Sequence, residues 1–217
     1  MRSLLFAASA KDAARGREKM PDTAAAAPTA NPAALGLVGF GLTTVLLSLI
    51  NAGVLPVGGE GVVIPLALAY GGFIQILAGL LEFRLGNTFG MTAFLSYGAF
   101  WWWFAFLLLF AHQGMIDISG AGPTIGIALL LWGLLTFYLW ISTFRLPRIL
   151  FAIFLTLWIT FLLLGLGGVM GAANLKHLGG WLGLVCGTLA VYGSFGLVTN
   201  ATWGRPVIPL GEKPILS

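Results

Sequence analysis

The sequence is poor in charged residues. Only 8% of its 217 residues are Asp, Glu, Lys or Arg, whereas soluble domains carry about 25%. Hydrophobic residues make up 59%, and the mean hydropathy is +0.97. A soluble fold of this composition would expose large apolar patches and aggregate. The shortage of charge therefore excludes an ordinary soluble domain and predicts an integral membrane protein.

Cysteine and the common catalytic motifs are also scarce. Cys186 is the single cysteine and lies in an apolar run, which excludes a disulfide framework and a cysteine metal site. The sequence contains neither GxxxxGK[ST] nor HExxH, so it indicates neither an ATP-driven pump nor a zinc hydrolase. Its two histidines, His112 and His177, fall in breaks between apolar runs, where a solvated loop residue is the default. We therefore expect no metal, no cofactor and no enzymatic activity.

Six long apolar runs, separated by short polar breaks, dominate the rest of the chain. A helix needs about 20 residues to cross a bilayer, and the runs have that length. No region alternates with the period of a strand over regular short segments, which argues against a β-barrel. The sequence therefore predicts an all-α membrane protein with six transmembrane helices. The predicted spans are Leu35–Leu55, Val62–Leu81, Gly90–Ala111, Gly122–Thr143, Ile149–Met170 and Leu178–Thr199.

Composition divides the chain into three regions. Residues 1–30 hold five of the eleven Lys and Arg residues and an alanine run, without sustained periodicity, which predicts a disordered cytoplasmic N-terminal tail. Met20, within this region, is an alternative start. Residues 31–200 form the predicted six-helix transport domain, and residues 201–217 form a predicted cytoplasmic C-terminal tail.

The distribution of basic residues predicts the orientation. The two termini and the breaks after the second and fourth runs hold ten of the eleven Lys and Arg residues, and the other breaks hold only Lys176. By the positive-inside rule, both termini are cytoplasmic, in a plasma (inner) membrane. The net charge of +4 does not indicate a nucleic-acid partner, because the bases cluster in loops and tails. The expected partners are the solute, membrane lipid and further copies of the chain.

Three of the predicted helices carry polar and small residues along one face. In the third, Gly90–Ala111, Ser96 and Tyr97 share an arc of about 100° with Ala93 and Phe100. A lone hydroxyl in a membrane helix usually bonds its own backbone or a neighbouring helix, but polar groups at membrane depth also line cavities. Three such faces together predict a pathway. The candidate path residues are Thr43, Thr44, Ser48, Asn51, Gln75, Asn87 and Ser96.

The tryptophans and glycines predict close packing. Trp101, Trp102 and Trp103 fan across about 200° of a helix, so at least one should pack inward. Gly179, Gly183 and Gly187 repeat every four residues, which favours close helix contact and leaves open whether the partner helix lies in the same chain.

A short internal echo suggests an inverted repeat. The sequence YGAF at residues 97–100 is similar to YGSF at residues 192–195. Repeats three helices apart would have inverted topology, as in many transporters. This predicts a weak 3+3 inverted repeat, and chance similarity in apolar sequence explains the echo equally well.

Three segments resemble the acetate uptake transporter family, which includes bacterial acetate/succinate–proton symporters and fungal acetate permeases. They are NPAALGLVGFGLTT at Asn31–Thr44, YGGFIQILAGLLEFRLGNTFGMTAFLSYGAFW at Tyr70–Trp101 and GRPVIPLGE at Gly204–Glu212. The family opening is NPAPLGL, and here Ala34 replaces the second proline. The resemblance covers most of residues 31–212. The signature residues are Asn31, Pro32 and Gly36.

The resemblance implies a narrow path within each subunit and a ring-shaped homo-hexamer. It places an aromatic and aliphatic constriction at Phe40, Tyr97 and Leu157. Tyr97 lies on the polar face described above, and Phe40 shares a face of the first helix with Gly36, Thr44 and Ser48. The dipeptide Asn31-Pro32 predicts an N-cap followed by proline at the first helical position. Such a helix start either caps the helix only or attracts a carboxylate.

The leading hypothesis is transport of small monocarboxylates, acetate first, with succinate or other short acids as further substrates. Glu82 is the only acidic residue near a polar face and is the candidate for proton coupling. An ion pair with Arg84 explains Glu82 equally well, and a substrate that crosses as the neutral acid needs no protein carboxylate. The alternatives are a passive channel for small anionic or neutral solutes and a non-transporting signalling or scaffold protein.

Overall fold

The computed structural model describes residues 30–216, so the predicted tail at 1–30 lies outside the described residues except for its last position. Within this range six helices are long and apolar enough to cross a membrane, which confirms the predicted number. The second is one rod of 25 residues, Glu60–Arg84, whose middle is π-helical. The elements are α2 (Ala33–Asn51), α3 (Glu60–Leu66), the π-helix η1 (Ala67–Ile74), α4 (Gln75–Arg84), α5 (Thr88–His112), α6 (Gly122–Ser142), the 3₁₀ turn η2 (Thr143–Arg145), α7 (Arg148–Val169) and α8 (Ala173–Trp203).

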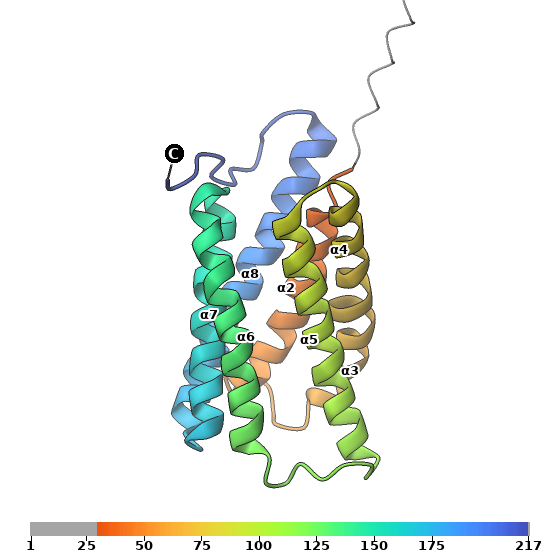
Figure 1. The fold of residues 1–217 in the computed structure, drawn as a ribbon, viewed down its shortest axis with the longest axis vertical. Helices are drawn as coiled ribbons and strands as arrows, with labels where there is room; N and C mark the ends of the chain where they lie inside the picture. Colours follow the sequence, from red (N-terminus) through yellow and green to blue (C-terminus); the bar gives the residue numbers. More distant parts are fainter. Residues whose placement is uncertain (1–29, 217) are drawn as a thin grey trace, which may run out of the picture. The chain divides into compact units, whose positions relative to one another are not determined.

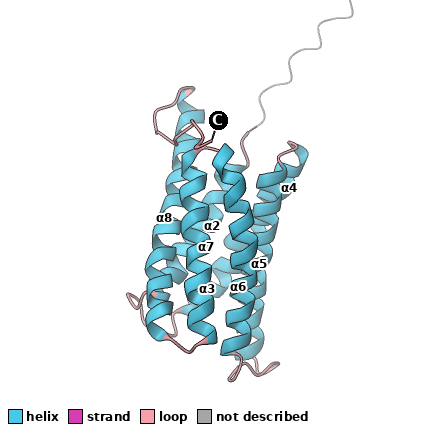
Figure 2. Cartoon of the chain, turned by 60° about the vertical axis from the view of Figure 1, so that its left-hand side comes forward, coloured by secondary structure: helices cyan, strands magenta, loops and turns pink. Residues whose placement is uncertain are grey.

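The helices of residues 31–216 stand side by side, and the loops lie at the two ends of the bundle (Figures 1 and 2). The start of α2, the α4–α5 turn, the α6–α7 turn and the C-terminal segment share the upper end in Figure 1. This upper end therefore holds five of the six described bases, and Lys176 lies at the lower end. The even number of crossings that the basic residues predicted is confirmed, and the cytoplasmic orientation of the base-rich end stays a prediction.

The helix boundaries differ from the predicted spans by up to five residues. The first span was predicted to reach Leu55, but α2 ends at Asn51 and is followed by Gly53 with φ +73°. The last span was predicted over Leu178–Thr199, but α8 runs from Ala173 to Trp203 and ends at Gly204, whose φ of +63° forms a left-handed cap. Hydropathy locates the apolar part of each helix, whereas backbone geometry decides where the helix ends.

The glycines of α8 pack within the chain. A Cβ built at Gly187 would lie 2.9 Å from the Gly41 carbonyl oxygen of α2, and one at Gly41 would lie 2.9 Å from that of Gly187. Gly183 faces Ser48 of α2, and Gly179 faces Leu164 of α7. The predicted close packing is therefore confirmed, and its partners are α2 and α7 of the same chain rather than another subunit.

The tryptophan triplet packs against the rod that contains the π-helix. Trp101 is 2% exposed, and a Cβ at Gly71 would collide with its ring. The indole Nε1–H of Trp102 donates to the Leu68 carbonyl oxygen at 3.0 Å, inside η1. Because a π-helix disturbs the regular hydrogen-bond ladder, this side-chain donor supports the wide turn. The prediction that at least one tryptophan packs inward is confirmed by Trp101.

The two similar segments, residues 97–100 and 192–195, lie in different surroundings. Tyr97 and Phe100 are buried in the core, whereas Tyr192 and Phe195 are exposed at 37% and 53%. The inverted repeat therefore stays a prediction, without support from the burial of the matching residues.

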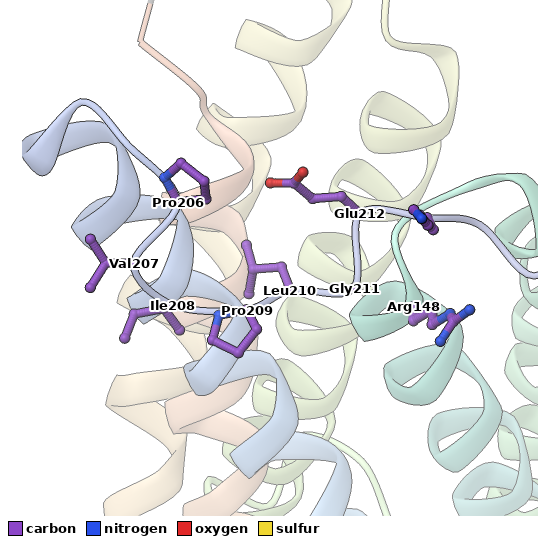
Figure 3. Close-up of a pocket in the computed structure, with 9 residues that line it drawn as sticks. Arg148, Pro206, Val207, Ile208, Pro209, Leu210, Gly211 and Glu212 are labelled. Atoms are coloured by element: carbon purple, nitrogen blue, oxygen red, sulfur yellow. The ribbon is translucent and has the colours of Figure 1, made fainter.

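The C-terminal segment is folded against α7 and α8 rather than extending as a free tail (Figure 3). The backbone N–H of Arg148 donates to the Gly211 carbonyl at 2.8 Å, and that of Ile149 to the Leu210 carbonyl at 3.1 Å. The side chain of Asn200 in α8 donates to the Ile208 carbonyl at 2.9 Å. These bonds hold the segment across the base-rich ends of both helices.

A cavity of about 590 Å³ lies along this segment, lined by residues 206–213 and Arg148. The carboxylate of Glu212 and the guanidinium of Arg148 are directed away from each other in Figure 3. The cavity lies at the base-rich end of the bundle, and of the helices that carry the predicted constriction it touches only the start of α7, at Arg148.

Candidate functional site

Three helices bring the predicted constriction residues into one buried cluster. Phe40 of α2 and Tyr97 of α5 have ring centroids 5.7 Å apart, and Leu157 belongs to the same cluster from α7. All three side chains are no more than 5% exposed, so the chain is closed at this level. Phe154, one turn before Leu157, lies 6.1 Å from Tyr97 and completes the aromatic group. Sequence reasoning missed Phe154 because α7 is apolar on all sides.

The Tyr97 hydroxyl is bound to a residue that the sequence analysis did not select. It donates to Thr136 Oγ1 at 2.9 Å, and Thr136 in turn donates to the Trp132 carbonyl at 2.7 Å. Thr136 lies on α6 and is fully buried. The Tyr97 proton is therefore directed to Thr136 in this arrangement. A single threonine in an apolar run gave no signal of this role.

Two further path candidates carry buried oxygens without a partner. Thr44 Oγ1 on α2 and Gln75 Oε1 at the start of α4 accept no hydrogen bond among the described residues. Leaving such a group unsatisfied costs about 1–3 kcal/mol. Thr43, in contrast, is satisfied, because its hydroxyl donates to the Gly39 carbonyl at 2.8 Å. Among the predicted path residues, these two oxygens are therefore the buried ones left without a hydrogen bond.

The remaining hydroxyl and amide candidates lie away from the constriction or serve packing. Ser48 is buried against Gly183 of α8. Asn51 is the last residue of α2, about 16 Å along the helix from Phe40. Ser96 is half-buried on α5. The structure therefore does not gather all seven predicted path residues at one level.

Glu82 and Asn87 form a pair at the base-rich end. Glu82 is 2% exposed, and its Oε2 accepts from Asn87 Nδ2 at 2.7 Å, while its Oε1 has no partner among the described residues. Asn87 also caps α5, because its Oδ1 accepts from the Gly90 N–H at 3.1 Å. Arg84 is exposed and bonds neither Glu82 oxygen, so the ion pair that the sequence allowed is not formed. Asn87 is therefore engaged in capping and in holding Glu82, not free to line a path.

The signature residues at the start of α2 have structural partners. The helix begins at Ala33 with Pro32 in the N-cap position, one residue later than predicted. Asn31 Oδ1 accepts from the Ala33 N–H at 3.0 Å, so the asparagine still caps the helix. Gly36 lies against the ring of Phe94, where a Cβ would come within 2.6 Å. The signature therefore sets the start of α2 and its contact with α5.

Metal binding has no support in the described range. Among residues 30–216 no group of three His, Cys, Asp or Glu side chains is placed to hold a metal ion. The polar contact at the constriction joins two hydroxyl groups, those of Tyr97 and Thr136.

Six membrane-length helices around a buried constriction define an integral, multi-pass membrane protein. Residues 17–210 match the GPR1/FUN34/yaaH family, and the chain belongs to that family.

Similar proteins agree with this assignment. The chain is 44% identical to the succinate-acetate/proton symporter SatP of Escherichia coli K12, over 85% of this chain and 96% of that protein. It is 37% identical to acetate permease A of Emericella nidulans, over 85% of this chain and 67% of the permease. It is 39% identical to ammonia transport outward protein 2 of Saccharomyces cerevisiae, over 79% of this chain and 62% of that protein. The solved structure of the bacterial acetate channel SatP superposes with a TM-score of 0.81 at 43% identity, covering 85% of this chain and all of that one.

Proposed function

We propose that this protein conducts acetate, and to a lesser extent other short carboxylic acids such as succinate, across a membrane, and that it has no enzymatic activity. The buried constriction of Phe40, Tyr97 and Leu157 carries the proposal, because it gives the bundle one narrow point with a polar group on an aromatic ring. The names of the bacterial and fungal relatives support acetate as the solute.

The distribution of charge favours a small monovalent or neutral solute. The described bases are exposed and lie in turns, at helix ends or in the C-terminal segment, none of them at the constriction. A multiply charged anion would meet no fixed counter-charge there, and unpaired charge at membrane depth is costly. The Gln75 amide can both donate and accept, which matches the two oxygens of a carboxyl group. We therefore assign Thr44 and Gln75 to solute contact and Phe40, Tyr97 and Leu157 to gating.

A proton that is transported together with the solute has two candidate carriers. Glu82 is buried with one oxygen free, and it lies near the base-rich end of the bundle. The solute itself is the other carrier, if it crosses as the neutral acid. The first carrier predicts that Glu82→Gln abolishes coupling, and the second predicts that coupling survives that change.

We also propose a homo-hexamer, which rests on the family resemblance. The glycine seam of α8 is used within the chain, so it does not supply the contact between subunits. Light scattering of the purified protein in mild detergent tests the proposal, and a monomeric mass would contradict it.

Flux through purified protein in liposomes tests the proposed function. Labelled acetate should enter faster than into protein-free liposomes, and internal unlabelled acetate should accelerate exchange. A passive channel would show no acceleration by counterflow, and a scaffold protein would show no flux. Selectivity among acetate, lactate and succinate should change in Phe40→Ala, since a ring at a narrow point excludes solutes by size and by dewetting.

A further inference from the structure

We propose that the cavity between the C-terminal segment and the start of α7 binds the phosphate group of an anionic membrane lipid, with Arg148 and Lys213 as the cationic contacts. The cavity has a volume of about 590 Å³ and is lined by Arg148 and by residues 206–213. None of the three constriction residues lines it, so a lipid site here is additional to the proposed function and does not depend on it.

The backbone of the C-terminal segment folds through its carbonyl groups. The carbonyls of four successive residues, 208–211, accept from Asn200, from the Tyr192 hydroxyl and from the first turn of α7. The N–H groups of residues 210–213, in contrast, donate to no acceptor among residues 30–216. Gly211 has a φ of +69°, the left-handed conformation found in backbone nests that bind anions. Successive donors are therefore left for an anion in a stretch that lines the cavity.

The charge around the cavity is mainly positive. The α6–α7 turn and the C-terminal segment hold four bases and one acid, namely Arg145, Arg148, Arg205, Lys213 and Glu212. The N–H of Leu216 donates to the Phe144 carbonyl at 2.9 Å, which holds the end of the segment beside that turn. The guanidinium of Arg148 is directed away from the Glu212 carboxylate (Figure 3). Arg148 is therefore not neutralised by Glu212, and a guanidinium can bind a phosphate through two parallel hydrogen bonds.

The position and the lining of the cavity favour a lipid over a free phosphate ion. Arg148 is the first residue of the membrane-length helix α7. Trp203, the last residue of α8, is exposed and has the Arg205 guanidinium carbon 5.9 Å from its ring centre. Tryptophan at a helix end is typical of the headgroup level, where basic pockets bind lipid phosphates. Residues 206–210 are all apolar and line the cavity together with Arg148, which suits an amphipathic ligand (Figure 3).

Calorimetric titration of the purified, delipidated protein with short-chain lipids in one mild detergent tests the proposal. Dihexanoyl phosphatidylglycerol is the anionic probe, and dihexanoyl phosphatidylcholine has the same chains with a zwitterionic headgroup. Inorganic phosphate represents the free ion. The wild type should bind phosphatidylglycerol much more tightly than either of the other two, because only this probe combines a net negative charge with an apolar part.

Three variants change the charge of the cavity in known directions. Arg148→Gln and Lys213→Gln should each weaken phosphatidylglycerol binding about tenfold, because each removes a hydrogen bond between charged groups. Glutamine keeps the side-chain stem that packs on Gly211 and the backbone N–H that holds the segment. Glu212→Gln should strengthen binding, since it removes a repelling carboxylate. Arg84→Gln is the matched control and should bind as the wild type does, because Arg84 is an exposed base at the same end that does not line the cavity.

Melting temperatures without lipid show which variants are folded, and Lys213→Gln, at an exposed position outside the helices, keeps the test valid if Arg148→Gln is unstable. Unchanged affinity in the folded Arg148→Gln and Lys213→Gln proteins would overturn the proposal. Equal weakening in Arg84→Gln would do so as well, because it would mean attraction by general surface charge. Binding of inorganic phosphate or phosphatidylcholine as tightly as phosphatidylglycerol would refute an anionic lipid as the ligand, as would a wild type that binds none of the three.

Discussion

The substitution Gly187→Ala tests the packing that positions the constriction. The new Cβ would lie 2.8 Å from Val45 Cγ2, 2.9 Å from the Gly41 carbonyl oxygen and 3.0 Å from the Val45 backbone nitrogen. Two of these atoms belong to the backbone of α2 and cannot rotate away, so α2 and α8 must separate by a few tenths of an ångström or more. Overpacking of this kind costs about 1–3 kcal/mol. For a chain of this size, that corresponds to a fall in melting temperature of roughly 3–9 °C.

The assay is thermal unfolding of the purified protein in one detergent, with Gly193→Ala as the matched control. Gly193 is also buried on α8, but its nearest neighbours, side-chain atoms of Ile149 and Leu37, would lie 3.4 Å from a Cβ, which is ordinary contact. The control should melt within about 1–2 °C of the wild type. Equal melting temperatures for Gly187→Ala and Gly193→Ala would refute the backbone contact between α2 and α8.

Three further predictions follow from separate features. Phe40→Ala should shift uptake from acetate toward lactate or succinate, measured in liposomes at matched protein density, and unchanged selectivity would remove this ring from the path. Trp102→Phe should lower the melting temperature more than Trp103→Phe, because it removes the indole hydrogen bond to the Leu68 carbonyl of η1, worth about 0.5–1.5 kcal/mol. Equal melting would show that the bond is dispensable. A tag at either terminus should be protected from protease in right-side-out vesicles, and accessibility of one terminus alone would contradict six crossings.

The six spans were predictable from sequence because a helix must have about 20 mostly apolar residues to cross the hydrocarbon core of a bilayer, and hydropathy detects such segments. The π-helix was not, because the rod from Glu60 to Arg84 has the composition of a regular membrane helix. Its support comes from Trp102, on a helix that follows later in the chain. The ends of α2 and α8 were also missed, because they are set by backbone geometry at Gly53 and Gly204 rather than by hydropathy.

Phe40 and Tyr97 were predictable as candidates because small and polar residues accompany them on their helix faces. Thr136 and Phe154 were not, because the residues one turn away on the same helix faces are mostly large and apolar, and each acquires its role only through Tyr97. The acceptor to which a threonine hydroxyl donates also cannot be predicted from sequence alone. It follows from which carbonyl lies within reach, and for Thr43 and Thr136 that carbonyl is four residues earlier in the same helix.

Three helices, α2, α5 and α7, start at the base-rich end. Groups of the chain itself already bond some of the N–H groups in their first turns, which affects how this end would bind an anion. The first turn of α2 is capped by Asn31 and lies near the Glu82 carboxylate. The first turn of α5 is capped by Asn87, and that of α7 donates to the carbonyls of the C-terminal segment. A helix start attracts an anion through its free N–H groups, and here groups of the chain itself take up part of them at each helix. The Asn31 cap is therefore formed at the start of α2, and attraction of a carboxylate by this helix start stays a prediction.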